Sequence, residues 1–433
     1  MALTDPLPVE PLAGPLDAVV RVPGSKSITN RALVCAALAQ GDSEVQGALE
    51  ADDTIAMVEG LQALGVEVTA SWADQTIRVH GCAGRPPAEL AFVDARLSGT
   101  TSRFLLPVAA LGAGTARVDG SLGLRARPMG HAVEALRALG STVAEVGEPG
   151  HLPLEVRDGP LAGGEVALPG DASSQFLSGL LLAGPAMRTG LTVRLTTELV
   201  SRPYVDMTTA VMEAFGVGVG RPDEGTWVVE PALYQGTAYA VEPDASAASY
   251  PFAAAAIVGG RVTVEGLGGG SLQGDLGFVD LLERMGATVE RSAGSTTVVG
   301  TGRLHGIEAD LSQLSDVAQT LAVVAAFADS PTRISGIGFI RGKETDRIGN
   351  VVAELRRAGI DAEEEPDGYV VRPGAVRPAT VETYEDHRMA MAFALLGLRA
   401  PGIRIADPSC VAKTYPGFWS MLHGLGSTTH TGH

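Results

Sequence analysis

Lysine is nearly missing from this chain of 433 residues. Of its 32 basic residues, 29 are arginine and three are lysine, at Lys26, Lys343 and Lys413. Arginine holds carboxylate or phosphate with a rigid planar fork, whereas lysine is a compact charge whose pKa can be shifted and whose proton can be transferred. All three lysines lie in polar motif segments, so we expect them to perform chemistry that arginine cannot.

The chain also has only three cysteines, no basic residue in its first 20 positions and no long apolar run. Cys35, Cys82 and Cys410 are odd in number and lie far apart with no histidine at ligand spacing, so neither a disulfide framework nor a zinc site is implied, and a reducing cytoplasm is favoured. No basic residue precedes Arg21 and prolines interrupt this opening segment, contrary to a secretory signal, and no apolar run reaches the roughly 18 residues of a membrane helix. We therefore expect a cytoplasmic protein.

The balance of charge is strongly acidic. The formal net charge is -18, which opposes nucleic acid or an anionic membrane as a partner, because both require a basic surface. Small anions remain suitable partners if the cations gather in one cleft. We expect small-molecule substrates and a monomer.

An internal repeat organises the chain. Six segments each place a polar turn before a helix that is apolar on nearly every side. Equivalent points in the six turns are 70 to 74 residues apart, so a unit of about 72 residues fills the chain. These points are Lys26, Thr100, Asp171, Asp244, Asp316 and Asp386.

The remainder of each unit is also regular. A short alternating strand follows the apolar helix, and then come an amphipathic helix that ends in glycine and a β-hairpin, which gives βαβαββ in an α/β (α+β) fold. The sixth copy stops at Gly426 without its hairpin, and we expect the opening strand, Asp17 to Val22, to complete the C-terminal half. The repeat predicts two lobes of three units, one from residues 24–242 and one from residues 1–23 and 243–433.

The polar turns have two interpretations. Ser, Thr and Asp are ordinary capping residues at a helix N-terminus. The same positions also attract anions, because the free N–H groups and the helix dipole favour negative charge. For a single turn, capping is the better interpretation, but basic side chains from both lobes could converge on one cleft and hold a small polyanion.

Ten ordered motifs between Val22 and Gly417 carry a resemblance: GSKSITNR, SGTTSRF, LRARPMGH, GDASSQF, SRPYVDMT, PDASAASYPF, LSDVAQT, KETDRI, EDHRMAMA and AKTYPGF. In these the chain resembles the 5-enolpyruvylshikimate-3-phosphate synthases, or 3-phosphoshikimate 1-carboxyvinyltransferases. The resemblance implies a two-lobed, inverse α/β barrel-like fold with three units per lobe and the active site in the cleft between them. It implies transfer of the enolpyruvyl group of phosphoenolpyruvate to the 5-hydroxyl of shikimate 3-phosphate, in the shikimate pathway of aromatic amino-acid (chorismate) biosynthesis.

The same resemblance assigns the binding residues. The residues that it implies for binding shikimate 3-phosphate are Lys26, Ser27, Arg31, Ser173, Ser174, Gln175, Ser201, Tyr204, Asp316 and Lys343. The residues that it implies for binding phosphoenolpyruvate are Lys26, Gly99, Arg127, Gln175, Arg347, Arg388 and Lys413. Where the family often has Asn, this chain has Leu97 and Phe339, so two polar contacts are uncertain.

The reaction needs one base and one acid. We expect Asp316 to be the base, because neighbouring lysines and arginines keep a carboxylate ionised at neutral pH. The resemblance implies Glu344 as the acid and Lys26 competes with it, a choice that the sequence leaves open. No metal, redox centre or other cofactor is expected.

Two other functions compete with this one. The sister family transfers enolpyruvyl to UDP-N-acetylglucosamine, but its characteristic loop cysteine would fall within Asp119 to Pro128, where this chain has none. A noncatalytic protein that binds phosphorylated metabolites would gain nothing from Asp316 and Glu344 among its cations. Finding these carboxylates away from the basic residues would favour such a binder.

Overall fold

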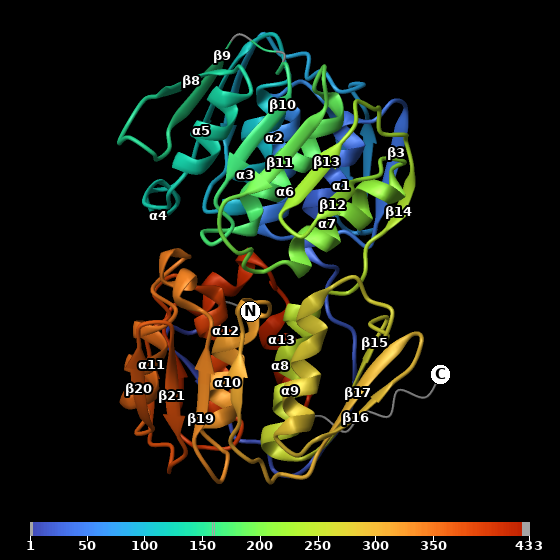
Figure 1. The fold of residues 1–433 in the computed structure, drawn as a ribbon. Coiled ribbons are helices and arrows are strands. Elements are labelled where there is room, and N and C mark those ends of the chain that lie inside the picture. Colours follow the sequence, from blue (N-terminus) through green and yellow to red (C-terminus); the bar gives the residue numbers. More distant parts are fainter. Residues whose placement is uncertain (1–2, 158, 160, 427–433) are drawn as a thin grey trace. The chain divides into compact units, whose positions relative to one another are not determined.

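The computed structural model describes residues 3–157, 159 and 161–426, and the chain divides into two units. One unit consists of residues 1–23 and 243–433, and the other of residues 24–242 (Figure 1). We call them the discontinuous unit and the continuous unit. The predicted lobe ends at 1–2 and 427–433 lie outside the described residues.

Six buried helices form the centres of the two units. As the apolar pattern predicted, nearly every residue in them is buried, for instance all of Ile28 to Leu38 in the first helix. The continuous unit contains α1 (Lys26–Leu38), α3 (Gly99–Ala109) and α6 (Ser174–Ala183), and the discontinuous unit contains α8 (Ala245–Val258), α10 (Ala318–Ala325) and α12 (His387–Gly397). Each unit therefore has one hydrophobic core of its own.

Six separate sheets cover these helices, in the barrel-like arrangement of repeated units that was expected but without a closed barrel. Five of them have four strands with one shared order: the first two strands are parallel, and the hairpin pairs antiparallel to the second. In the continuous unit the strands are β3 (Asp42–Gln46), β4 (Glu67–Ser71), β5 (Thr76–His80) and β14 (Ala238–Ala240); β6 (Leu90–Asp94), β7 (Thr115–Asp119), β8 (Thr142–Glu145) and β9 (Leu154–Arg157); and β10 (Gly164–Leu168), β11 (Leu191–Leu195), β12 (Gly220–Asp223) and β13 (Thr226–Val229).

The discontinuous unit repeats this plan with one shortened sheet. Its strands are β2 (Leu16–Val20), β15 (Gly260–Glu265), β16 (Thr288–Arg291) and β17 (Ser295–Gly300); β18 (Glu308–Asp310), β19 (Thr332–Ser335), β20 (Asp361–Glu365) and β21 (Gly368–Arg372); and β1 (Leu7–Val9), β22 (Ala379–Val381) and β23 (Ile403–Ile405). The predicted opening strand is β2, and it does join this unit, beside β15. It belongs to the fourth sheet, however, whereas β1 completes the sixth.

The outer helices are amphipathic, as expected. They are α2 (Asp52–Ala63), α5 (Gly130–Ala138), α7 (Pro203–Ala214), α9 (Phe278–Arg284), α11 (Gly349–Arg357) and α13 (Phe418–Gly424), with a short α4 (Leu122–Arg125) in addition. After five of them the predicted glycine has a positive φ, at Gly65, Gly140, Gly216, Gly286 and Gly359. Within the described ranges, no helix is both long enough and apolar enough to cross a lipid bilayer.

Side-chain capping explains five of the six polar turns. Ser25, Ser98, Ser173, Asp244 and Asp386 each accept a backbone N–H at the start of a buried helix. The remaining buried helix, α10, is preceded by a 3₁₀ turn, Ser315–Val317, and has no side-chain cap. Asp316 lies inside this turn, and its carboxylate is therefore available for other partners.

Candidate active site

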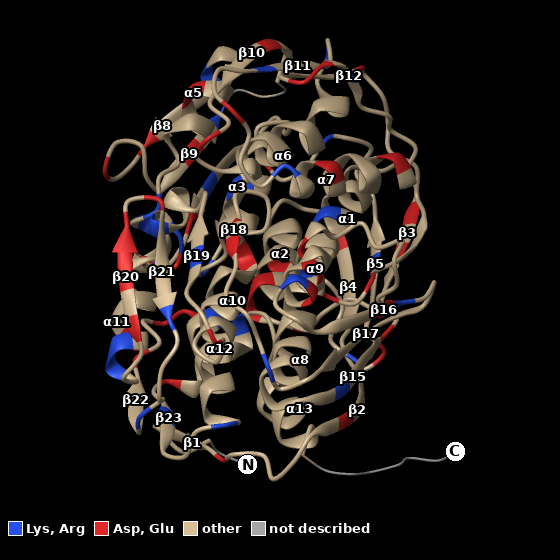
Figure 2. Cartoon of the chain, turned by 60° about the horizontal axis from the view of Figure 1, so that its bottom comes forward, with Lys and Arg blue, Asp and Glu red and all other residues tan. Residues whose placement is uncertain are grey.

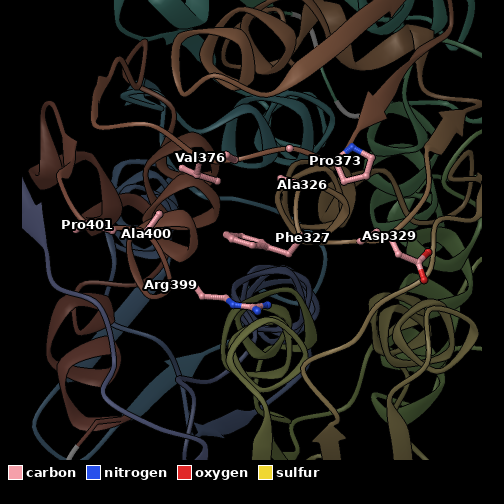
Figure 3. Close-up of a pocket in the computed structure, with 11 residues that line it drawn as sticks. Ala326, Phe327, Asp329, Pro373, Val376, Arg399, Ala400 and Pro401 are labelled. Carbon is pink, nitrogen blue, oxygen red and sulfur yellow. The ribbon is translucent and has the colours of Figure 1, made fainter.

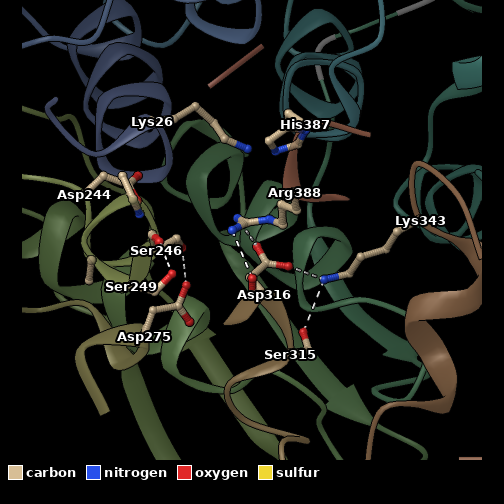
Figure 4. A network of polar contacts seen from close by, with 12 residues as sticks. Lys26, Asp244, Ser246, Ser249, Asp275, Ser315, Asp316, Lys343, His387 and Arg388 are labelled. Carbon is tan, nitrogen blue, oxygen red and sulfur yellow. Dashed lines mark hydrogen bonds and ion pairs between the residues drawn. The ribbon is translucent and has the colours of Figure 1, made fainter. Parts of the chain in front are cut away.

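Asp316 lies at the centre of a charged cluster in the discontinuous unit (Figure 4). Its Oδ1 accepts a hydrogen bond from Nζ of Lys343 at 2.6 Å, and its Oδ2 accepts one from Nη2 of Arg388 at 2.8 Å. Nη1 of Arg388 also donates to the Asp316 carbonyl at 3.0 Å, and Nζ of Lys343 donates to Ser315 Oγ at 3.2 Å. Three residues that the sequence assigned to the site thus meet at one carboxylate.

Arg347 connects Asp316 to a second carboxylate. Its Nη1 lies 3.4 Å from Asp316 Oδ1, and its Nε and Nη2 donate to the two oxygens of Asp386 at 2.7 and 3.1 Å. Asp386 is fully buried and also accepts the backbone N–H of Arg388 as the cap of α12. This bidentate pair fixes the plane of the Arg347 guanidinium.

Glu344 and Lys413 complete the cluster. Glu344 lies 2.8 Å from Nη2 of Arg347 and 3.5 Å from Nζ of Lys413. The cluster therefore contains four cations, Lys343, Arg347, Arg388 and Lys413, and three carboxylates, Asp316, Glu344 and Asp386. With one positive charge in excess, it can accept an anion, and both predicted catalytic carboxylates lie among its basic residues.

The charges of this cluster set its protonation states. Burial alone would raise the pKa of Asp316, but Arg388, Lys343 and Arg347 outweigh it and hold the pKa of that carboxyl well below its usual value. Burial lowers the pKa of Lys343, and the charge of Asp316 offsets part of this effect. Burial, with Lys413 and Arg388 nearby, also keeps the pKa of His387 well below its usual value. These shifts favour an ionised Asp316 and a neutral His387 at neutral pH.

In the continuous unit, Arg31 and Lys26 project from the first turns of α1. Nζ of Lys26 pairs with Asp53 at 3.2 Å. Arg31 is buried and donates to Thr208 Oγ1 at 2.7 Å and to the carbonyls of Ser27 and Tyr204 at 2.8 and 3.0 Å. Burial lowers its pKa to about 10, so Arg31 remains a cation at neutral pH.

A second group surrounds the start of α3. Nη1 of Arg103 donates to Gln175 Oε1 at 2.7 Å, and Nε2 of Gln175 donates to Thr100 Oγ1 at 3.4 Å. A Cβ atom on Gly99 would lie 2.8 Å from Nη1 of both Arg103 and Arg127. The absence of a side chain at Gly99 therefore allows two guanidinium groups to approach the helix N-terminus.

The predicted serines lie near the helix starts of the same unit. Ser173 caps α6 through the N–H of Gln175, Ser174 is buried beside it, and Ser201 has a positive φ of 53° just before α7. The ring of Tyr204 lies 5.9 Å from the Arg31 guanidinium. Since α1, α6 and α7 pack together, the structure brings these residues into one region of the unit.

Residues that stand where the family often has Asn make apolar contacts. Phe339 packs against the core of its unit, and its ring centroid lies 5.7 Å from Nζ of Lys343. Leu97 packs against the other core, and its Cδ1 lies 3.0 Å from the position of a Cβ on Gly123. The polar contact that was uncertain at Phe339 is thus replaced by a cation–π contact.

Two acidic residues that pair with predicted site residues were not predicted from the sequence. Asp386 was used only to mark the repeat, although its place before His387 and Arg388 in the EDHR motif indicated a capping acid beside an arginine. Asp53, the partner of Lys26, lies on α2 and had no signal in the sequence.

A pocket in the discontinuous unit lies away from these groups (Figure 3). It has a volume of about 600 Å³ and is lined by Phe327, Val376, Arg399 and Pro401, among others. Phe327 and Arg399 follow the C-terminal ends of α10 and α12, whereas the charged cluster lies at the N-terminal ends of these helices. None of the predicted site residues lines this pocket.

Exposed strands carry part of the acidic charge. Figure 2 shows acidic residues along β20, where Glu363 pairs with Arg372 at 2.8 Å and Glu365 pairs with Arg333 at 3.0 Å. Arg347 and Lys413 of the cluster are buried, in contrast. No group of three or more potential metal ligands occurs in the part of the chain that the structure describes, and all three cysteines are free thiols.

Known proteins are similar to this chain in both sequence and fold. The model of the family described as EPSP synthase (3-phosphoshikimate 1-carboxyvinyltransferase) matches residues 12–422. The 3-phosphoshikimate 1-carboxyvinyltransferase of Nostoc punctiforme is 44% identical over 419 residues, covering 96% of this chain and 98% of the relative. That of Methanosphaerula palustris is 44% identical over 416 residues, covering 95% and 98%. An EPSP synthase structure from Acinetobacter baumannii has a TM-score of 0.82 at 28% identity, covering 97% of this chain and 98% of that one. A family match over almost the whole length, together with these relatives, shows that this chain belongs to the EPSP synthase family.

Proposed function

We propose that this protein transfers the enolpyruvyl group of phosphoenolpyruvate to the 5-hydroxyl of shikimate 3-phosphate. The products are 5-enolpyruvylshikimate 3-phosphate and phosphate, in the pathway to chorismate and the aromatic amino acids. Family membership supports the reaction. The chain is expected to act as a monomer in the cytoplasm.

The observation that carries the proposal is the environment of Asp316. Against the effect of burial, neighbouring cations hold the pKa of its carboxyl well below the usual value, and it lies within hydrogen-bond distance of Lys343 and Arg388, at the N-terminal end of a buried helix that it does not cap. A protein that only bound anions would weaken its site by placing Asp316 and Glu344 among the cations. Both carboxylates contact those cations, which favours an enzyme over a binder.

Binding requires that two multiply anionic substrates approach each other. Arg347, Arg388 and Lys413 are the groups of the discontinuous unit that we assign to phosphoenolpyruvate, and Lys343 and Asp316 are those that we assign to shikimate 3-phosphate. From the continuous unit we assign Arg31 with Ser27, Ser173, Ser174, Ser201 and Tyr204 to shikimate 3-phosphate, Gly99 and Arg127 to phosphoenolpyruvate, and Lys26 and Gln175 to both. Exclusion of water around these pairs would strengthen each of them.

The chemistry needs two proton transfers in its first half. Asp316 accepts the proton of the 5-hydroxyl while that oxygen forms a bond to C2 of phosphoenolpyruvate. An acid delivers a proton to the methylene carbon, which becomes a methyl group, and the result is a tetrahedral ketal phosphate. The C2–O bond to phosphate then breaks, the methyl group loses a proton, and the enol ether and phosphate are formed.

Two residues compete for the role of acid. Glu344 must be protonated before it can donate, and its ion pairs with Arg347 and Lys413 oppose protonation. The negative charge of bound substrate would offset this opposition. Lys26 is a cation that can donate directly, and its partner is Asp53. Loss of turnover in Glu344→Gln but not in Lys26→Met would select Glu344, and the reverse would select Lys26.

Phosphate release tests the function as a whole. Phosphoenolpyruvate is supplied with either shikimate 3-phosphate or UDP-N-acetylglucosamine as the acceptor. We expect release with shikimate 3-phosphate only. Release that prefers the sugar nucleotide would overturn the assignment, and release with neither acceptor would favour the noncatalytic binder.

A further inference from the structure

A tight turn with two strained residues precedes α12. Tyr384 and Glu385 have φ values of 55° and 59°, and the N–H of Asp386 donates to the carbonyl of Thr383 at 2.9 Å. Positive φ at both central positions is what a type I′ turn requires, and Gly, Asn and Asp are the residues that usually adopt it. Tyrosine and glutamate occupy it here at a conformational cost, so other contacts must stabilise the turn.

Glu354 of α11 supplies these contacts. Its carboxylate is fully buried. Oε1 accepts the hydroxyl of Tyr384 at 2.8 Å, and Oε2 accepts the backbone N–H of Glu382 at 3.0 Å. One side chain therefore contacts both the residue before the turn and the first of its two strained residues. The remaining partner of Glu354 is Nε of Arg357, also at 3.0 Å, on the solvent side.

The turn places Asp386 in the charged cluster. Asp386 follows Glu385 directly, holds the Arg347 guanidinium by two hydrogen bonds, and caps α12 through the N–H of Arg388. Arg347 and Arg388 both approach Asp316. A change in the backbone at Tyr384 and Glu385 would move Asp386, and with it the two guanidinium groups.

We propose that Glu354, through Tyr384, is a positioning residue for the phosphoenolpyruvate arginines. Glu354 touches neither substrate in this proposal. It keeps the turn in its strained conformation, and the turn sets the geometry of Arg347 and Arg388. The assignment of these arginines to phosphoenolpyruvate rests on the proposed function, but the mechanical link from Glu354 to Arg347 does not.

A purely structural role makes a different prediction. If Glu354 only stabilised the fold, its loss would lower the melting temperature and leave the kinetic constants of the folded enzyme unchanged. If it positions the arginines, the KM for phosphoenolpyruvate rises while the KM for shikimate 3-phosphate stays near the wild-type value. A displacement of about 1 Å in a binding group is enough for a loss of up to roughly a hundredfold in rate.

Tyr384→Phe is the main test variant. The side chain of Tyr384 is partly exposed, so removal of its hydroxyl leaves the core intact. Glu354→Gln is the second variant, because it removes the negative charge and replaces one of the two accepting oxygens with an NH2 group. Arg357→Lys is the conservative control, since a lysine keeps a positive charge beside the Glu354 carboxylate and the Tyr384 hydroxyl. We expect an increase of about tenfold or more in the KM for phosphoenolpyruvate in the first two variants and none in the control.

Glycine in the turn should rescue the defect. Glu385 is exposed, and glycine adopts a positive φ without strain. Glu385→Gly alone should resemble the wild type, and Tyr384→Phe combined with Glu385→Gly should recover most of the lost affinity for phosphoenolpyruvate. A destabilised variant with unchanged KM, or a double variant without recovery, would overturn the proposal.

A spectroscopic measurement separates this proposal from the proposed function. The Nε–H of Arg347 donates to a buried carboxylate, so it should give a slowly exchanging NMR signal, which Arg347→Lys identifies by its loss. We expect this signal to shift or exchange faster in Tyr384→Phe and to return in the double variant. If the Arg347 signal is unchanged in Tyr384→Phe, the link from Glu354 to Arg347 is refuted even though the enzyme is active. If the wild-type protein shows no turnover with phosphoenolpyruvate and shikimate 3-phosphate, only the proposed function is refuted.

Discussion

Replacing Asp316 by asparagine removes one negative charge while it keeps the size of the side chain. The wild-type carboxylate is held by Lys343 at 2.6 Å and Arg388 at 2.8 Å, with Arg347 at 3.4 Å. Asparagine retains one oxygen as an acceptor for these donors. It cannot accept the proton of a hydroxyl group, because the amide oxygen is a very weak base. The variant should therefore still bind shikimate 3-phosphate but lose turnover.

The size of both effects follows from the geometry. A positioned general base contributes about 10²–10⁴-fold to a rate, and we expect kcat to fall by that factor. Removing one partner of a buried ion pair costs about 3–5 kcal/mol, and the lower end applies here because the amide oxygen remains. In a unit of about 200 residues each kcal/mol corresponds to roughly 2–4 °C, so the melting temperature should fall by about 10 °C.

Three measurements on one preparation test this reasoning. Phosphate release gives kcat, calorimetric titration gives the affinity for shikimate 3-phosphate, and thermal unfolding gives the melting temperature. Asp361→Asn is the matched control, because this exposed carboxylate lies 3.6 Å from Arg372 on the surface and its loss should change none of the three. A kcat equal to that of the wild type would remove Asp316 from the role of base.

Three further predictions concern single features of the site. Gly99→Ala would place a Cβ 2.8 Å from Nη1 of Arg127, so we expect a higher KM for phosphoenolpyruvate with kcat retained in steady-state kinetics, and an unchanged KM would contradict this reading of the contact. Phe339→Asn removes the ring beside Lys343, worth about 0.5–1 kcal/mol, and should lower the melting temperature slightly while decreasing the KM for shikimate 3-phosphate; an increased KM would show that the ring itself aids binding. Burial tends to raise the pKa of Asp316, but Arg388, Lys343 and Arg347 hold it well below its usual value, so its stabilising contribution is complete above about pH 4 and is lost as the pH falls through the folded-state pKa. Thermal unfolding measured as the pH is lowered from 6 should therefore show a smaller loss of stability in Asp316→Asn than in the wild type. An equal loss in the two proteins would refute the link between the charge of Asp316 and stability.

Much of the fold was predictable because the repeat is visible in local patterns. Helices that are apolar on every side can be stable only when enclosed, and the segments from Ile28 to Leu38 and from Ala247 to Ile257 are indeed buried. The strand that was missed, β1, contains Pro8 in a segment of only three residues. Proline is tolerated there because β1 is an edge strand, a property that depends on the sheet and not on the local sequence.

The scarcity of lysine identified part of the site. Lys343 and Lys413 both belong to the charged cluster, where their compact ammonium groups contact Asp316 and Glu344. The residues that orient the cluster could not be found in this way. Asp386 and Glu354 act on partners 39 and 28 residues distant in the chain, and Glu354 reaches the turn because α11 packs against β22, the strand that precedes the turn. Hydrophobic periodicity and capping signals extend over only a few residues, so they do not indicate contacts between residues this far apart in the chain.

The position of Asp316 in its turn shows how one repeat unit became different from the others. Asp244 and Asp386 each stand directly before their helix, and their carboxylates satisfy its first N–H groups. In the unit of Asp316 a 3₁₀ turn begins one residue earlier, at Ser315, so the aspartate lies within the turn. Its carboxylate is then directed to Lys343 and Arg388 in place of the backbone. Natural sequences tend to depart from local rules at functional sites, where the lost stability is compensated elsewhere. On that ground, the turn in which the sequence predicts a cap and the structure shows none is where we expect the reaction to take place.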